Sequence, residues 1–144
     1  MNREVIQAAC AHARSTYPDE CCGLVLADDA GKERFVAIAN IAGTRSAEGT
    51  SKRSLRDGYV MEPKALLAAL DEGRLVAIVH SHPDVGAYFS REDRDMALGG
   101  ADQPLWPGVQ YLVVSVRQGV ADDARIFDWD PAAGDFRETQ VPVT

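Results

Sequence analysis

The sequence predicts one α+β domain in which a mixed central sheet is flanked by helices, a three-layer α/β/α arrangement. Residues 22–27, 75–79 and 109–116 are largely apolar segments of strand length, as expected for strands covered on both faces. Stretches with helical spacing of apolar residues lie between these strands. Because 144 residues are the size of one ordinary domain, we expect a single domain over residues 1–144.

The first predicted elements are a helix and a hairpin. Apolar residues recur at helical spacing over residues 2–17, where Asn2 can cap the helix and Pro18 ends it. The first apolar strand then leads into turn-forming residues 28–32. Residues 34–39 alternate between polar and apolar types, which predicts the returning strand of a hairpin.

A long irregular segment follows the hairpin. Residues 40–57 are rich in Gly, Ser and Thr and have almost no apolar periodicity. We expect a mobile surface loop there, and we expect it to contact the substrate. Pro63 then suits the first turn of a helix that stops at Gly73.

The second half of the chain continues the alternation of helices and strands. The strand at residues 75–79 runs directly into a histidine, and residues 90–98 predict a short helix. Glycines and prolines break the chain in the loop 99–107, which we also expect to contact the substrate. Two strands are expected after the third apolar segment, at residues 124–129 and 136–141.

Charge and composition exclude several classes of protein. The formal net charge of −7 repels phosphate backbones, so we expect no nucleic-acid partner. No apolar run approaches the length of a membrane span, and the start MNREVIQ is not typical of a signal peptide. Three cysteines do not form a disulfide framework. We therefore expect a cytoplasmic protein with no membrane partner.

The most specific pattern lies at the end of the second apolar strand. His80 and His82 follow that strand, and Asp93 comes in the first turn of the next helix. Alternate residues of a strand face the same side, so both imidazoles can bind one ion, and the loop can bring Asp93 to them as a third ligand. Two histidines and a carboxylate, with the fourth position left to water, are typical of catalytic zinc sites.

Each half of this pattern also has a purely structural explanation. The two histidines fit ordinary positions in a strand and a loop. Ser90 and Asp93 have the spacing of a capping box, in which each side chain bonds the other residue's backbone N–H. The cap and the metal site are partly compatible, because a carboxylate in the first helical turn can still face a metal.

Together with an upstream glutamate, this spacing resembles the JAMM (MPN-plus) motif of zinc metalloproteases, here His80-x-His82-Pro-x6-Ser90-x2-Asp93. Residues 18–26, which include Glu20, are similar to the glutamate-plus-strand segment of bacterial members. In element order the resemblance covers roughly residues 1–140. It implies a three-layer, cytidine-deaminase-like fold.

The resemblance also implies a role for each matched residue. His80, His82 and Asp93 would bind Zn²⁺, with water as the fourth ligand. Glu20 would be the general base that takes a proton from that water and returns it to the leaving amine. Ser90 would donate a hydrogen bond to the oxyanion. Without the resemblance, Glu20 would be read as a solvated turn residue.

The resemblance further implies a substrate class. Its members mostly cut after the terminal Gly-Gly of ubiquitin-fold proteins, and a glycine pair fits a narrow cleft because it lacks side chains. Short bacterial members resemble enzymes that act on sulfur-carrier proteins. We expect hydrolysis of a peptide or isopeptide bond after the C-terminal Gly-Gly of a ubiquitin-like or sulfur-carrier protein. The alternatives are a phage-tail or cell-wall-associated endopeptidase and a non-catalytic MPN scaffold module.

Other candidate residues have simpler explanations. Cys21 and Cys22 face opposite sides of a strand, and we expect both to be buried small apolar residues. Asp84 is expected to be solvated. Trp106 is expected to anchor packing. Tyr88 is expected to anchor its loop, with a place in the substrate cleft as the alternative.

Overall fold

The computed structural model describes residues 1–42, 45–46, 49–50, 55–56 and 58–144. Its helices are α1 (Arg3–Thr16), α2 (Pro63–Leu70) and α3 (Arg91–Leu98). The main sheet contains the strands β1 (Cys22–Ala27), β2 (Glu33–Ile38), β5 (Arg74–Pro83), β6 (Gln110–Arg117), β7 (Val120–Asp130) and β8 (Asp135–Gln140). No helix in the described part of the chain has the length and hydropathy needed to cross a membrane.

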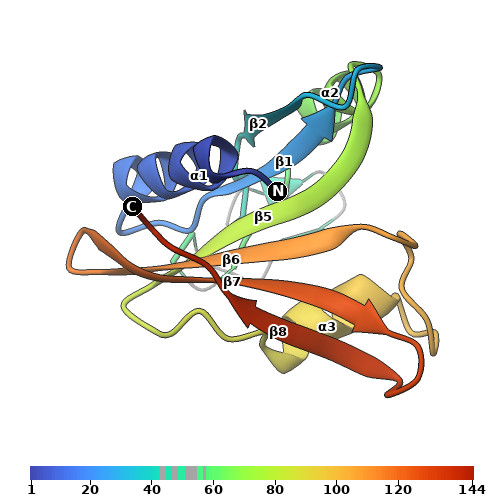
Figure 1. The fold of residues 1–144 in the computed structure, drawn as a ribbon. Helices are drawn as coiled ribbons and strands as arrows, with labels where there is room; N and C mark the ends of the chain where they lie inside the picture. The colour runs from blue at the N-terminus through green and yellow to red at the C-terminus, as the bar shows by residue number, and fades with distance from the viewer. Residues whose placement is uncertain (43–44, 47–48, 51–54, 57) are drawn as a thin grey trace.

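The sheet is mixed, as predicted. Its strand order is β2-β1-β5-β6-β7-β8, and every neighbouring pair is antiparallel except β5 and β6, which are parallel. Parallel neighbours require a crossover connection, because the chain must return to the end from which it started. Helix α3 and its two flanking loops form this crossover, which returns the chain from the end of β5 to the start of β6 (Figure 1).

The helices cover both faces of the sheet, so the predicted three layers are present. Helix α1 packs on one face, where its Ala9 and Ala13 belong to the same buried cluster as Val25 and Leu112. On the opposite face α2 packs over alternate residues of β1, and α3 packs over alternate residues of β6. Figure 1 shows α1 and α3 on opposite sides of the central strands.

The helix ends follow the local rules that the sequence suggests. Asn2 is the N-cap of α1, and its Oδ1 accepts a hydrogen bond from the N–H of Val5 at 2.9 Å. Pro63 is the first residue of α2. Gly99 ends α3 in the left-handed conformation, with φ +58°, which is the usual place for glycine.

Two strands are longer than the sequence predicts. Strand β5 continues through His82 to Pro83, because it stays paired with β6 over these residues. Strand β7 begins at Val120 instead of residue 124. The turn before it consists of Gln118 and Gly119, both with positive φ, and such two-residue turns hold strands together from their first residue.

Part of the segment predicted as an irregular loop is regular. A short hairpin, β3 (Arg45–Ser46) with β4 (Gly49–Thr50), lies within it. Residues 43–44, 47–48, 51–54 and 57 lie outside the described residues, so the mobility expected for residues 40–57 stays a prediction.

Gly23 in β1 provides a test of the packing between β1 and β2. A Cβ atom at this position would lie 2.6 Å from Phe35 Cε2 and 2.6 Å from the carbonyl oxygen of Val36. Relieving the second contact would require the backbone of β2 to move, which is destabilising. We expect Gly23→Ala to lower the free energy of unfolding by about 1–3 kcal/mol, measured by denaturant titration. Gly86→Ala is the matched control, because its added Cβ would meet Tyr88 Cδ1 at an ordinary 3.6 Å. Equal stability of the two variants would contradict this account.

Candidate functional site

Strand β5 holds two imidazoles on one face of the sheet. His80 and His82 are two residues apart on this strand, so both point to the side that carries α2 and α3, whereas Ala77 and Val79 pack toward α1. Both histidines are buried, with exposed fractions of 1% and 5%. At His80 the strand is paired with β1 on one side and β6 on the other, and at His82 it stays paired with β6.

The first turn of α3 brings a carboxylate to the histidines. Ser90 is the N-cap of α3, and its Oγ accepts a hydrogen bond from the N–H of Asp93 at 3.0 Å. The N–H of Ser90 donates in return to Asp93 Oδ2, also at 3.0 Å. The capping box is therefore present. The same carboxylate faces the histidines, so the two explanations of Asp93 are compatible.

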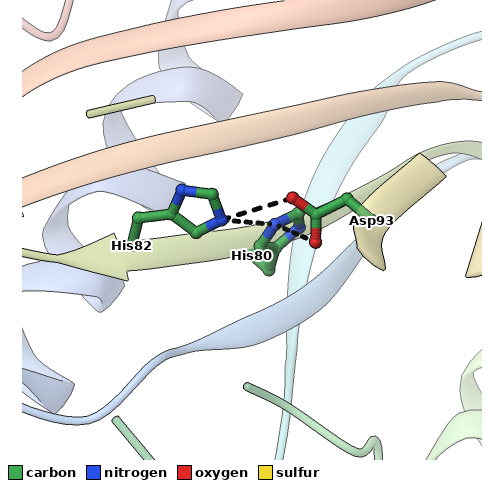
Figure 2. A group of neighbouring side chains, drawn as sticks. All are labelled: His80, His82 and Asp93. Atoms are coloured by element: carbon green, nitrogen blue, oxygen red, sulfur yellow. Dashed lines mark hydrogen bonds and ion pairs between the residues drawn. The ribbon is translucent and has the colours of Figure 1, made fainter. Parts of the chain in front are cut away.

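The three side chains converge at one point (Figure 2). His80 Nε2 lies 3.1 Å from His82 Nε2 and 3.1 Å from Asp93 Oδ1, and His82 Nε2 lies 3.3 Å from Asp93 Oδ2. Zinc ligands at about 2.0–2.1 Å in a tetrahedron are separated by about 3.3 Å. The donor types and their spacing therefore fit a tetrahedral metal ion, and these three residues could hold one.

Hydrogen bonding sets the protonation of His82. Its Nδ1 lies 2.9 Å from the carbonyl oxygen of Gly86, which can only accept, so Nδ1 carries the proton. In the neutral ring Nε2 then keeps its lone pair, which is the state a metal ligand needs. Burial favours the neutral ring, but the hydrogen bond with Asp93 outweighs it, and the pKa of His82 is raised.

The electrostatics of the other two residues also suit a metal centre. Burial lowers the pKa of His80, so its imidazole is neutral. Burial would raise the pKa of the Asp93 carboxyl, but the hydrogen bonds with His80 and His82 outweigh this and hold it well below its ordinary range. The His80 ring stacks on Tyr59, with 4.8 Å between the ring centroids. A neutral imidazole and an ionised carboxylate are the forms that bind metals.

A polar cleft of about 230 Å³ opens beside this cluster, lined among others by Glu20, Arg56, Tyr59, His82, Tyr88, Ser90, Glu92 and Asp93. Glu20 and Ser90, the other residues singled out from the sequence, therefore share the cleft with two of the three clustered side chains. The exposed fraction of Glu20 is 7%, so its alternative explanation as a solvated turn residue is wrong. Its N–H donates to the carbonyl of Leu55 at 2.7 Å.

An apolar groove of about 270 Å³ also borders the cluster, lined among others by Tyr59, Leu66, Ile78, His80, Asp93, Met96, Trp106 and Tyr111. Its walls come from α2, α3 and the segment before β6. Trp106 was expected to anchor packing, but its exposed fraction is 44% and it lines this groove. It lies in the loop 99–107, whose contact with a substrate stays a prediction.

The cysteines are buried apolar residues, as predicted. Cys21 belongs to the cluster under α1 and Cys22 to the cluster under α2, so they face opposite sides of the sheet. Burial raises the pKa of both thiols to about 12. A thiol with such a pKa is a poor nucleophile at neutral pH.

Three features of the site were missed or misjudged from the sequence. Asp84 is partly exposed, as expected, but its partners were missed: its carboxylate accepts hydrogen bonds from the Tyr17 hydroxyl at 2.8 and 2.9 Å and from the N–H of Gln118 at 2.8 Å. Arg56 and Tyr59 line the polar cleft and belong to no motif. Arg56 lies within the segment that was expected to contact the substrate, which is the only sequence signal that pointed to it.

Two relatives of known name resemble this chain in sequence. The CysO-cysteine peptidase of Mycobacterium tuberculosis is 32% identical over 114 residues, which cover 79% of this chain and 70% of that protein. The tail tip assembly protein K of Escherichia phage N15 is 39% identical over 94 residues, or 65% of this chain. The matched part spans about a third of the phage protein, 34% of its length.

Solved structures confirm the fold, and a family comparison identifies the domain. A protein from Salinibacter ruber superposes with a TM-score of 0.60 at 24% identity, covering 96% of this chain and 86% of its own. A JAB1/MPN domain protein from Archaeoglobus fulgidus gives 0.52 at 13% identity, covering 92% and 89%. Residues 2–130 match the prokaryotic homologs of the JAB domain. With its fold and its 32% identical relative, this match shows that the chain belongs to the family of prokaryotic JAB-domain homologs.

Proposed function

We propose that this protein is a zinc-dependent metallopeptidase that hydrolyses a peptide or isopeptide bond after the C-terminal Gly-Gly of a ubiquitin-like or sulfur-carrier protein. The observation that carries the proposal is the convergence of His80 Nε2, His82 Nε2 and the Asp93 carboxylate beside a cleft that Glu20 also lines. The 32% identity to a CysO-cysteine peptidase supports a peptidase that acts on a carrier protein.

The donor set favours zinc over other ions. Two imidazole nitrogens and one carboxylate oxygen are the ligands of many catalytic zinc sites, whereas Mg²⁺ and Ca²⁺ prefer oxygen ligands alone. His80, His82 and Asp93 would hold the ion, and the polar cleft would leave its remaining side open to substrate. Zinc bound there supplies a Lewis acid that activates water and polarises the scissile carbonyl.

Glu20 would move the proton. The carboxylate lines the cleft beside His82 and Asp93 and is largely shielded from solvent. A shielded carboxylate at this place can accept a proton from the attacking water and pass it to the nitrogen of the leaving amine. Hydrolysis requires both transfers, because an amide nitrogen leaves poorly unless it is protonated.

Ser90 would stabilise the developing negative charge. Its Oγ already accepts the N–H of Asp93, and this bond uses an oxygen lone pair, not the hydroxyl proton. The proton can therefore be donated to the oxyanion that forms from the substrate carbonyl. The cap fixes the position of Oγ at the entrance of α3 before substrate arrives.

The shape of the cleft suits a substrate with small residues at the scissile bond. Tyr59 and Tyr88 are part of its lining, and the Tyr88 ring centroid lies 5.1 Å from that of His82. Glycines on the carrier side of the scissile bond allow the extended backbone to reach the metal-ligand cluster past Tyr59, which lines both the polar cleft and the neighbouring apolar groove. A Gly-Gly terminus meets this requirement.

The phage relative favours a second candidate function. Its 39% identity over 94 residues fits an endopeptidase that cuts an unrelated peptide in a phage tail or a cell wall. A non-catalytic scaffold is the third possibility, although all five motif positions are filled in this sequence. Measured substrates and zinc content distinguish the three.

The first test is cleavage of a carrier fusion. A ubiquitin-fold carrier extended by a short peptide after its Gly-Gly terminus should be cut directly after the second glycine, as measured by mass spectrometry. Removing metal with a chelator should abolish cleavage, and added Zn²⁺ should restore it. Cleavage that persists in chelator contradicts the proposal, and cleavage only elsewhere in the peptide favours the endopeptidase.

The second test separates the proton carrier from the metal ligands. We expect Glu20→Gln to keep zinc while kcat falls by about 10²–10⁴-fold, because the neutral amide cannot accept a proton. His82→Ala should lose zinc as well, because it removes one of three ligands. Zinc content by atomic absorption and kcat/KM on the carrier fusion check both. A fully active Glu20→Gln protein would remove the assigned role of Glu20.

The third test uses the competition between protons and zinc. Because the pKa of His82 is raised, its ring gains a proton as the pH falls through that pKa, and the proton must leave before zinc binds. Zinc affinity should therefore weaken by up to about tenfold per pH unit on the acid side. Chelator competition between pH 8 and pH 5.5 measures this. His12→Gln, which removes the histidine of α1, should leave the slope unchanged, and a flat profile in the unaltered protein would refute the prediction.

A further inference from the structure

The polar cleft and the apolar groove beside the metal-ligand cluster differ in chemistry. This difference indicates in which of them each side of the scissile bond lies. Asp93 and Tyr59 line both hollows, but Glu20 lines only the polar cleft. If Glu20 delivers the proton to the leaving amine, as the proposed function requires, the leaving group lies in the polar cleft. The carrier side of the scissile bond then approaches from the apolar groove.

The polar cleft contains a guanidinium among carboxylates. Three acidic residues line it, Glu20, Glu92 and Asp93, and Arg56 is the one Lys or Arg among its described lining residues. The carbonyl of Leu55, the residue before Arg56, accepts the backbone N–H of Glu20 at 2.7 Å. The residue that precedes Arg56 is therefore hydrogen-bonded to the backbone of Glu20, the residue that would protonate the leaving nitrogen.

Asp84 holds Arg56 from outside the cleft. Arg56 Nη2 lies 3.0 Å from Asp84 Oδ2, and Asp84 is not part of the cleft lining. The Asp84 carboxylate is itself fixed by the N–H of Gln118 and the Tyr17 hydroxyl, which lower its pKa and keep it charged. Arg56 is thus anchored through a residue that is bonded to two other parts of the fold.

The anchored guanidinium still has donors to offer. A guanidinium carries five N–H groups, and the bond to Asp84 uses Nη2. The side chain of Arg56 is 55% exposed, so further N–H groups can reach a second anion in the cleft. A carboxylate is the natural partner, because the planar fork of N–H groups matches its two oxygens.

We propose that Arg56 is a specificity-determining residue of the proposed peptidase: it receives the free α-carboxylate of a single amino acid attached to the Gly-Gly terminus of the carrier. This inference rests on the proposed function and specifies its substrate. In such an adduct the carboxylate carbon is two bonds from the scissile nitrogen, about 2.5 Å away. In an internal peptide that carboxylate is an amide, and in an isopeptide with a lysine side chain it is several bonds more distant.

The size of the cleft suits this substrate, and its hydrolysis requires no reactant other than water. A cleft of about 230 Å³ has room for one amino acid. Water adds its oxygen to the carbonyl carbon and the C–N bond breaks. One proton of that water reaches the amine, and the products are the carrier carboxylate and a free amino acid.

The test compares two carrier fusions that end in Gly-Gly-Ala, one with a free carboxylate and one with a carboxamide. We expect kcat/KM of the unaltered protein to favour the free acid by about tenfold, as for a partly exposed carboxylate–guanidinium contact. Arg56→Gln should bring this ratio close to one. Arg91→Gln is the matched control, because it removes an arginine that is 95% exposed on α3 and does not line the cleft. It should leave the ratio unchanged.

Binding of the same fusions separates this inference from the proposed function. In the Glu20→Gln background, calorimetry should show tighter binding of the free acid, and Glu20→Gln/Arg56→Gln should lose the difference. If the unaltered protein cleaves both fusions equally, or if the free acid and the amide bind with equal affinity, the role of Arg56 is wrong while the peptidase assignment stands. If neither fusion is cleaved but the acid still binds more tightly through Arg56, the proposed peptidase function fails and the carboxylate site remains.

Discussion

His80 Nε2 and His82 Nε2 lie 3.1 Å apart because β5 keeps its pleat to its last residue. A strand at the edge of the sheet could twist or fray there, but β5 is paired with β1 as far as His80 and with β6 as far as Pro83. Cys22 and Val113 flank His80 in these two strands. The spacing of the two imidazoles is therefore a property of the sheet interior, and the cluster depends on it more than on any contact between the side chains themselves.

The third member of the cluster depends on a helix end. The Ser90–Asp93 capping box places the carboxylate and begins α3 at the same time. Such caps stabilise helices by about 1 kcal/mol. Because Asp93 Oδ2 accepts from the Ser90 N–H while Oδ1 faces His80, one side chain links the onset of a helix to the end of a strand. The local geometry of α3 thereby sets the position of the ligand, and the loop between β5 and α3 does not have to set it alone.

Local patterns in the sequence were sufficient for most of the fold and for part of the site. The period of two in β5 predicted that His80 and His82 share a face, and the Ser90–Asp93 spacing predicted the cap. Where the prediction failed, the cause was a contact with residues distant in sequence. Glu20 is shielded beside a segment 35 residues further along the chain, whose Leu55 carbonyl accepts its N–H. Asp84 is bonded to residues 67 and 34 positions away, and no local pattern indicates such partners.

The shared role of Asp93 has an evolutionary consequence. An asparagine side chain keeps an oxygen that can accept the Ser90 N–H, so replacing Asp93 with Asn would preserve the cap while removing the anionic ligand. Asp and Asn codons differ by one base. A duplicated gene could therefore lose the metal chemistry proposed here in a single step and still encode a folded domain, free to diverge as a binding protein.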